Sequence, residues 1–519
     1  MKNVFLSMAF VLLSVVAASQ AMAQSKKIKY EESWESLSQV NQTPDWFLDA
    51  KLGIYAHWGP TSEAFEGADP TKHYPGWHGM FMYHDGKKVP TKDGKPSSNF
   101  VHHTQKYGDP AEHGYTEVIE NFKPTNFDAK IWADLFAKSG AKFAGPVAMH
   151  HDNFAMWDAK STRWNSMNYG GIDPSADLKR EIEAKGLKYM ASFHHAFTWK
   201  FFAPAHAYGG VADVDYDLYT NPHDLESVTP DDRFRKEWWA KLKEYIDTYQ
   251  PDLLWFDWWL ENLPEADRQK FLAYYYNEAQ KWGKEVCVAY KETTFPIETA
   301  IKDYERGRPN QPKDPAWLTD TSPGAWFYRA GAKFSSPNEL IDILIDIVAK
   351  NGIMLLNVPP DPDGTIPQEM VSLLEDMGKW LSVNGDAIYG TRPWTVFGEG
   401  PTRLPEGGHK VEKIKIAYTS TDIRYTKKSD KEFYAIVMDK PGEEIVLKAL
   451  STDLGVLNSA IQKVSLLGSN EELKWKRDGR GLVIQSPKSL PTAYAHAFKI
   501  VTQGYSENDI GGNVTAHAD

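Results

Sequence analysis

Over roughly its first 385 residues the chain alternates short apolar runs with longer polar stretches in which apolar residues recur at helical spacing. The apolar runs, which predict buried strands, are residues 52–56, 142–149, 188–193, 253–256, 285–290 and 353–358. The stretches with helical spacing are residues 127–138, 179–184, 234–249, 265–282 and 338–349. Strands that alternate with helices are typical of parallel βαβ units, and this many in succession predict an α/β fold, a (β/α) TIM-like barrel, over residues 24–388.

Beyond residue 389 the pattern changes to short, partly alternating segments that are separated by Gly, Pro, Asp and Asn. These segments are residues 414–418, 433–438, 444–450 and 481–485. Short strands bounded by turn residues are typical of an all-β sandwich. We therefore expect a C-terminal β-sandwich domain over residues 389–503, followed by a polar, flexible tail over residues 504–519.

The first 23 residues have the pattern of a signal peptide. A basic start with Lys2 precedes an apolar run over residues 4–18, and Ala21 and Ala23 form a small-residue cleavage site. No other segment approaches the ~20 uninterrupted apolar residues that a membrane-spanning helix needs. We expect cleavage near Ala23 and an exported protein, periplasmic or extracellular, with no membrane span.

Composition narrows the range of partners. The formal net charge is −12, and acidic and basic residues are mixed along the chain, which argues against a basic face for nucleic acid or anionic membrane. The 19 tryptophans and 13% aromatic content suit the flat faces of sugars, but composition alone favours ordinary core packing. The single cysteine, Cys287, lies in an apolar run and is expected to be an inert packing residue.

Polar residues stand directly after four of the predicted strands. The first is followed by His57, the second by His150 and His151, and the next two by His194 and Asp257. In a parallel barrel the carboxyl ends of the strands meet on one face, where active sites lie. Any one of these histidines has a structural role as its alternative, but four strand ends with His or Asp together predict a site.

Two chemistries use such a set. Histidines with an aspartate can bind a catalytic metal, as in barrel hydrolases that carry an H-x-H pair after the first strand. Here that strand offers only His57, so a metal site is the weaker hypothesis. The stronger is a pair of carboxylates that acts on a sugar, with neutral histidines and tryptophans that bind hydroxyl groups and ring faces. That chemistry needs no cofactor.

Longer motifs carry a specific resemblance. In chain order they are K-L-G-I-Y-A-H-W-G (51–59), H-H-D-N-F-A-M-W-D-A-K-S-T-R-W-N-S (150–166), L-L-W-F-D-W-W (253–259), D-Y-E-R-G-R (303–308), W-L-T-D-T-S (317–322), N-G-I-M-L-L-N-V-P-P-D-P-D-G-T-I-P (351–367) and N-G-D-A-I-Y-G-T-R-P-W (384–394). Together they resemble the glycoside hydrolases of family 29, the α-L-fucosidases. The resemblance implies a barrel followed by a β-sandwich, and an exo-acting, retaining enzyme that removes terminal α-L-fucosyl residues from oligo- or polysaccharides by double displacement.

The resemblance also implies catalytic roles. The aspartate of the W-F-D stretch, Asp257, would be the nucleophile; the alternative is a helix N-cap after the strand. The acid/base lies on a loop that varies in this family, and Glu305, 48 residues downstream of Asp257, is the strongest candidate. Glu292 and Glu261 are the alternatives.

For sugar binding the resemblance points to His57, His150, His151 and Trp255, with His194, Trp77 and Trp326 as additions. Imidazoles can donate and accept hydrogen bonds to adjacent hydroxyls, and an aromatic wall can receive the C5 methyl group of fucose.

One position departs from the pattern. Many relatives carry a Glu-Trp pair whose glutamate binds sugar hydroxyls, whereas this chain has Gly76 before Trp77. Either His78 replaces the glutamate as a polar contact, or the loop is shaped for an unusual substrate.

Two other functions stay open: a non-catalytic fucose-binding protein on the same fold, and a metal-dependent hydrolase that uses His57, His150 and His151. The glycan is also open, and sulfated fucans become candidates if Arg306 and Arg308 line the outer cleft rather than form structural ion pairs.

Overall fold

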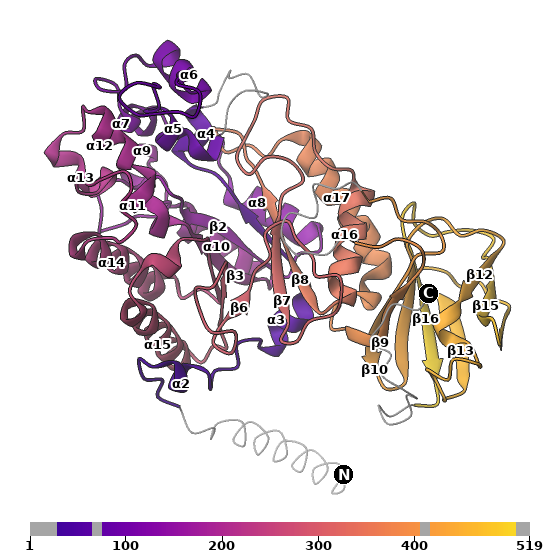
Figure 1. Ribbon diagram of the computed structural model, residues 1–519. Helices are drawn as coiled ribbons and strands as arrows, with labels where there is room; N and C mark the ends of the chain where they lie inside the picture. The colour runs from indigo at the N-terminus through magenta and orange to yellow at the C-terminus, as the bar shows by residue number, and fades with distance from the viewer. Residues whose placement is uncertain (1–27, 65–74, 405–415, 505–519) are drawn as a thin grey trace, which may run out of the picture.

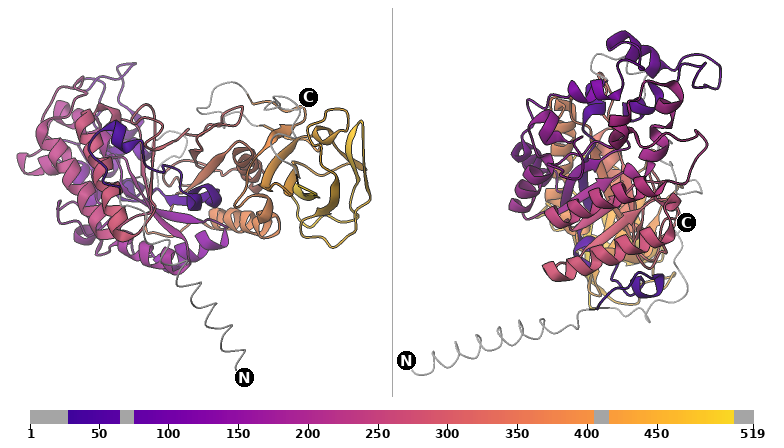
Figure 2. Two further views of the ribbon diagram at one scale, coloured as in Figure 1. Left: turned by 90° about the horizontal axis from the view of Figure 1, so that it is seen from below. Right: turned by 90° about the vertical axis from the view of Figure 1, so that its left-hand side faces the viewer.

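A computed structural model describes residues 28–64, 75–404 and 416–504. The predicted signal segment, residues 1–23, lies outside these residues, as does all of the predicted tail except Gly504. The described chain consists of an N-terminal barrel and a C-terminal pair of antiparallel sheets, with helices α16 (Pro337–Ala349) and α17 (Gln368–Asn384) between them (Figure 1). Seen from below, the C-terminal sheets lie at one end of an elongated molecule (Figure 2).

Eight parallel strands form the barrel, in the spatial order β6-β5-β4-β3-β2-β1-β8-β7. A parallel bridge between Asp303 and Leu318 brings the two edge strands together, so the barrel is nearly closed. The strands are β1 (Leu52–Ala56), β2 (Phe143–Met149), β3 (Lys188–Phe193), β4 (Leu253–Phe256), β5 (Cys287–Tyr290), β6 (Ile301–Lys302), β7 (Trp317–Thr321) and β8 (Gly352–Val358). With the C-terminal sheets, this confirms the predicted fold class.

Long helices cover the barrel where the sequence predicts them: α8 (Ala129–Lys138), α10 (Pro174–Ala184), α14 (Asp232–Tyr249), α15 (Glu265–Trp282) and α16. Residues 291–300 and 303–316, which connect β5 to β6 and β6 to β7, contain no helix. On this side the barrel departs from a regular (β/α) repeat, and loops rather than helices carry the chain past the strand ends.

Short helices fill the connections before β2, β3 and β4 and the start of the described chain. They are α2 (Trp34–Leu37), α3 (Asp45–Ala50), α4 (Pro60–Ala64), α5 (His78–Phe81), α6 (Ser98–Lys106), α7 (Tyr115–Glu120), α9 (Ser166–Gly170), α11 (Thr198–Phe201), α12 (Ala203–Tyr208) and α13 (Tyr216–Tyr219). Many of them lie over one end of the barrel (Figure 1).

Helix α16 begins at a capping box, in which the Ser336 side chain accepts from the Glu339 backbone and the Glu339 carboxylate accepts from the Ser336 backbone. The helix is buried on nearly all sides because it packs between β8 and the C-terminal strands. Inside this contact Asp346 forms ion pairs with Arg424 (2.7 Å), Lys350 (2.8 Å) and Arg308 (3.5 Å). A buried ionic cluster therefore joins the barrel to the C-terminal sheets.

The C-terminal sheets have the orders β13-β16-β11-β10-β9 and β12-β15-β14. Their strands are β9 (Arg392–Glu399), β10 (Ile423–Ser429), β11 (Glu432–Val437), β12 (Glu444–Leu447), β13 (Ile461–Leu466), β14 (Trp475–Asp478), β15 (Gly481–Gln485) and β16 (His496–Thr502). Apolar residues of both sheets, among them Phe433, Leu447 and Phe498, form one core. The strand predicted over residues 414–418 is wrong for its described part, because residues 416–418 are irregular.

Two further predictions concern single features. Cys287 is free and fully buried in β5, and burial raises the pKa of its thiol well above the ordinary value, as expected of an inert packing residue. Among the described residues, no helix has both the length and the apolar composition needed to cross a membrane.

Candidate active site

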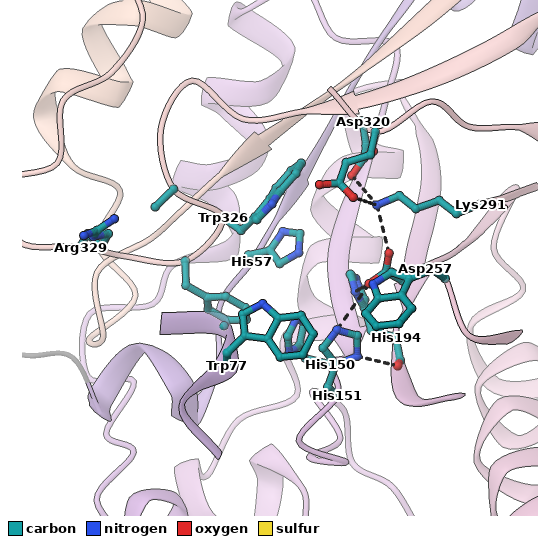
Figure 3. Close-up of a pocket in the computed structure, with 15 residues that line it drawn as sticks. His57, Trp77, His150, His151, His194, Asp257, Lys291, Asp320, Trp326 and Arg329 are labelled. Carbon is teal, nitrogen blue, oxygen red and sulfur yellow. Dashed lines mark hydrogen bonds and ion pairs between the residues drawn. The ribbon is translucent and has the colours of Figure 1, made fainter. Parts of the chain in front are cut away.

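A cavity of about 370 Å³ opens at the carboxyl ends of the barrel strands. Eight of the nine predicted site residues line it: Asp257, Glu305, His57, His150, His151, His194, Trp77 and Trp326. Its other lining residues include Gly76, Trp258, Lys291, Asp320, Phe327 and Arg329. Figure 3 shows His57, Trp77, His151, Asp257 and Trp326 around a common space, with Arg329 well apart from Asp257 and Lys291. The strand-end residues therefore converge as the sequence predicts.

Asp257 directly follows β4, and its backbone N–H continues the parallel ladder by donating to Phe193 O at 3.1 Å. The residue is only 7% exposed. His194 Nδ1 donates to Asp257 Oδ2 at 3.0 Å, and His151 Nε2 lies 3.5 Å from the same oxygen. Lys291 Nζ forms an ion pair with the other oxygen, Oδ1, at 3.0 Å. Both carboxylate oxygens are thus held in place, which fixes the side-chain rotamer.

The charge of Asp257 is set by competing effects. Burial alone raises the pKa of a carboxyl group, but the ammonium of Lys291 and then the ring of His194 more than offset it. The pKa of Asp257 is held well below its ordinary value. The group is therefore a carboxylate, the form that a nucleophile requires.

Lys291 is the centre of the ionic arrangement. It directly follows β5, is 5% exposed, and contacts Asp257, Glu305 Oε2 (3.2 Å) and Asp320 Oδ2 (3.3 Å). Burial lowers the pKa of an ammonium group, but the three carboxylates, Asp257 most strongly, raise the pKa of Lys291 well above its ordinary value. Lys291 is therefore a permanent cation between the carboxylates of the site.

This geometry limits the separation of the two predicted catalytic carboxylates. Asp257 Oδ1 and Glu305 Oε2 lie 3.0 and 3.2 Å from the same nitrogen, so these oxygens are at most 6.2 Å apart. Retaining glycosidases place their carboxyl groups ~5 to 5.5 Å apart, and inverting enzymes ~6.5 to 9.5 Å apart. The maximum separation of these two oxygens is therefore smaller than the carboxyl separation of inverting enzymes and is compatible with that of retaining enzymes.

Three of the cavity histidines, His57, His150 and His151, are neutral hydrogen-bonding groups. Burial lowers the pKa of His57, His150 and His151, that of His151 to about 4. His57 Nδ1 lies 2.8 Å from Asn357 Oδ1, and His151 Nδ1 lies 2.9 Å from the carbonyl of His194, so both rings donate through Nδ1. Their Nε2 atoms are then acceptors, to which the hydroxyl groups of a sugar can donate.

Trp255 is the predicted binding residue that does not line the cavity. Its side chain is fully buried within β4, where its ring lies 4.8 Å from Lys291 Nζ and its Nε1 donates to Asp303 Oδ2 at 3.0 Å. Asp303 accepts from the backbone N–H of Asp320 at 2.9 Å, and burial first and the Asp320 carboxylate second raise the pKa of Asp303. Tyr55 donates to Asp320 Oδ2 at 2.9 Å. Trp255 thus belongs to a layer beneath the cavity that supports Lys291.

Aromatic side chains form the walls. Trp77 packs against His151 and Trp258, with ring centroids 5.6 and 6.1 Å apart, and Trp326 packs against His57 at 5.4 Å. These contacts place Trp77 and Trp326 at the cavity surface.

Gly76 lines the cavity, and Phe327 packs over it. A Cβ at position 76 would lie 3.3 Å from the Phe327 ring, which itself contacts the rings of His57 (5.2 Å) and His150 (4.8 Å) edge-on. The proposal that His78 serves as the polar contact is wrong, because His78 is buried outside the cavity lining and hydrogen-bonds His103 at 3.2 Å. An apolar ring, Phe327, forms this part of the wall instead.

The remaining alternatives also lie elsewhere. Glu292 and Glu261 are absent from the cavity lining. Arg308 is buried against Asp346, and Arg306 donates to Gly324 O at 2.6 Å while its guanidinium stacks on Trp326. Both arginines are structural, as the sequence analysis allowed.

Among the residues that the structure describes, two groups of side chains have ligand atoms close enough for a metal: His57 with His150 and His194, and His151 with His194 and Asp257. His194 occurs in both, yet its Nδ1 donates to Asp257 and its Nε2 lies 2.8 Å from Ser192 Oγ. A metal at either place would have to displace one of these hydrogen bonds. In the second group it would also be repelled by the ammonium of Lys291, which pairs with Asp257. The donor set suits hydrogen bonding to a sugar better than metal coordination.

Comparison with known proteins agrees with this geometry. The sequence model of the alpha-L-fucosidase family matches residues 15–386, and that of the alpha-L-fucosidase C-terminal domain matches residues 417–501. The chain belongs to the α-L-fucosidase family. Membership makes it a glycoside hydrolase, which confirms the family and enzyme class predicted from the motifs.

Similar proteins extend over nearly the whole chain. The tissue alpha-L-fucosidase of Rattus norvegicus is 28% identical over 516 residues, 95% of this family member and 96% of the relative. The alpha-L-fucosidase of Dictyostelium discoideum is 29% identical, covering 72% of this chain and 76% of its own length. The Thermotoga maritima alpha-fucosidase, solved in complex with fucose, has a TM-score of 0.69 and 27% identity, over 91% of this chain and 100% of that chain.

Sequence reasoning missed several cavity residues. Lys291 follows an apolar run by the same rule that selected His57, so a search for any charged residue at a strand end would have found it. Asp320 lies inside a family motif. Phe327 and Arg329 lie on the loop after β7, and no local pattern marks them.

Proposed function

We propose that this family member hydrolyses terminal α-L-fucosyl residues with retention of configuration, with Asp257 as the nucleophile and Glu305 as the acid/base. The observation that supports the proposal most is the arrangement around Lys291, in which a buried, ionised Asp257 lies within 6.2 Å of the Glu305 carboxylate. Histidines and tryptophans that can bind hydroxyl groups and ring faces surround the pair.

In the first step, a carboxylate oxygen of Asp257 attacks the anomeric carbon while the glycosidic bond breaks. Glu305, protonated at this stage, gives its proton to the departing oxygen. In the second step, the resulting carboxylate of Glu305 removes a proton from water, and that water attacks the anomeric carbon and releases Asp257. Charge is conserved throughout, because the proton that leaves Glu305 with the aglycone is replaced from water.

The surrounding groups act on geometry and charge. His194 and Lys291 hold Asp257 by opposite oxygens, so its orientation is fixed before substrate binds. His57, His150 and His151 are placed to bond the sugar hydroxyls. Phe327 and Trp326 offer an apolar wall to the C5 methyl group, which distinguishes fucose from sugars with a polar C6.

Azide rescue tests both roles through the configuration of the product. In Asp257→Ala, azide takes the place of the nucleophile and should yield β-L-fucosyl azide from an activated α-L-fucoside. In Glu305→Ala, azide attacks the covalent intermediate and should yield α-L-fucosyl azide. Glu292→Ala is the matched control for Glu305 and should hydrolyse substrate as the wild type does. Wild-type turnover in Asp257→Ala would refute the assignment, and binding of fucosylated glycans with no hydrolysis would establish the non-catalytic alternative.

We also propose that the chain is exported, on the basis of the signal pattern of residues 1–23. Fractionation of producing cells, with N-terminal sequencing of the secreted or periplasmic form, tests this. Activity retained in the cytoplasm on an uncleaved chain would contradict it.

A further inference from the structure

A second cavity, of about 260 Å³, adjoins the candidate active site. Ala325, Phe327 and Arg329 line both cavities, so the two spaces share one wall on the loop after β7. The far side of the second cavity is formed by the connection from β8 to α17, including Asp361, and by the first turn of α17, including Glu369. A ligand that leaves the first cavity past Arg329 therefore enters the second.

Two opposite charges face this space without neutralising each other. In the described part of the chain, the side chains of Arg329 and Asp361 form no hydrogen bond or ion pair, either with each other or with other groups. Arg329 is partly exposed, and burial raises the pKa of Asp361 to about 6, with Asp363 and Glu369 adding to the effect. A guanidinium donor and a carboxylate acceptor are thus held apart across a cavity.

The wall that carries Asp361 is preformed. The loop is bonded to the barrel through Trp58 Nε1, which donates to Pro362 O at 3.2 Å, and through Trp132 Nε1, which donates to Gly364 O at 2.9 Å. Gly364 has φ 96°, and a Cβ there would lie 2.7 Å from the Phe127 backbone, so the turn requires glycine. Asp361 is therefore presented on a rigid element, which lowers the entropy cost of binding.

We propose that this second cavity binds the leaving-group sugar, an uncharged pyranosyl unit whose hydroxyl groups accept from Arg329 and donate to Asp361. The inference rests on the proposed function, since it places the sugar on the far side of the bond that is cleaved. A sugar hydroxyl group can accept from one neighbour and donate to another at once. The volume is just below the range for drug-sized ligands, ~300 to 1,000 Å³, and suits a single ring.

Charge favours an uncharged sugar over a sulfated one. Arg329 alone would attract a sulfate, but Asp361 and Glu369 line the same cavity and would repel it. Phe327 and Phe334 add apolar surface against which the C–H face of a sugar ring can pack.

The test compares two substrates in the same enzyme. Hydrolysis of α-L-fucosyl fluoride releases an ion that cannot contact the second cavity, whereas a neutral α-L-fucosyl disaccharide releases a sugar that can. The ratio of kcat/KM for the disaccharide to kcat/KM for the fluoride therefore reports leaving-group binding. We expect Arg329→Gln and Asp361→Asn each to lower this ratio about tenfold, because each removes a hydrogen bond to a charged group. Lys333→Gln removes an exposed charge from the same loop outside the cavity lining and should leave the ratio unchanged.

Each outcome decides a separate point. If the wild type hydrolyses neither substrate, the proposed function fails. If it hydrolyses the fluoride but no neutral disaccharide of a linkage panel, or if the ratio in both variants stays within about twofold of wild type, the leaving-group site is refuted. If a disaccharide with a sulfated leaving sugar is preferred, and Arg329→Gln abolishes that preference, the assignment to an uncharged sugar is overturned.

Discussion

Replacement of Lys291 by methionine removes the cation that the three site carboxylates share, while keeping most of the side-chain volume. At an effective dielectric constant of about 20, a unit charge pair 3.0 Å apart interacts by on the order of 5 kcal/mol. Part of this energy is spent on desolvating the buried ammonium, so we expect a net loss of about 2–4 kcal/mol in transition-state stabilisation. That corresponds to a fall of about 30- to 1,000-fold in kcat/KM.

The pH dependence gives the sharper readout. In the wild type the pKa of Asp257 is held well below its ordinary value, so this group is ionised throughout an assay range of about pH 4 to 8. Burial raises the pKa of Asp257, and Lys291 is the group that lowers it most. Without Lys291 the pKa of Asp257 therefore rises. The acidic limb of kcat/KM against pH, measured with α-L-fucosyl fluoride, should therefore move to higher pH in Lys291→Met.

Two further variants separate charge from structure. Lys291→Arg keeps the cation and should keep the acidic limb near its wild-type position even where the rate falls. Lys302→Met removes a lysine from neighbouring β6, outside the cavity lining, and should leave the profile unchanged. If Lys291→Met is folded, as judged by urea unfolding, and retains both its acidic limb and kcat/KM within about threefold, the electrostatic role assigned to Lys291 is wrong.

Three other predictions follow from the same structure. Gly76→Ala places a methyl group 3.3 Å from the Phe327 ring and should lower kcat/KM about three- to tenfold. The loss should vanish in a Phe327→Ala background, because the crowding ring is then absent. An equal loss in both backgrounds would contradict the contact. Asp346→Asn leaves buried cations unpaired and should lower the free energy of unfolding by about 3–5 kcal/mol in urea titrations. Asp376→Asn, at a half-buried position whose partner Lys379 is exposed, should not. Because its cationic partners outweigh burial and depress the pKa of Asp346, this stabilisation should be complete above about pH 4 and lost only in strong acid; a loss between about pH 5 and 7 would contradict the assignment. Prolonged dialysis against a chelator should leave hydrolysis unchanged, and a loss that Zn²⁺ restores would revive the metal-dependent alternative.

Hydrophobic pattern predicted most of the barrel because its strands are buried on both faces. The bounds expected for β1, β3 and β4 match the structure, and those for β2, β5 and β8 differ by at most two residues at one end. The hydrophobic pattern did not predict strands β6 and β7, for two different reasons. β6 has only two residues, too few to form an apolar run. β7 has Asp320 and two threonines among its five buried residues, so it does not read as an apolar run although it is buried.

Chain order by itself determined which polar residues reach the active face, because every parallel strand delivers its next residue to the same end of the barrel. His57, His194 and Asp257 were identified in this way. Family motifs added the distinction between nucleophile and acid/base, but they did not place either group in space.

The tertiary structure alone decided how these groups act on one another. Lys291 meets Asp257 and Glu305 because three successive strands end side by side, and the resulting pKa shifts depend on ångström distances that no sequence pattern encodes. Likewise, Phe327 covers Gly76 across some 250 residues of chain. Local sequence sets the elements and their polarity, whereas charge coupling and wall shape arise only when distant loops pack together, since Coulomb energy and steric contact depend on separation in space.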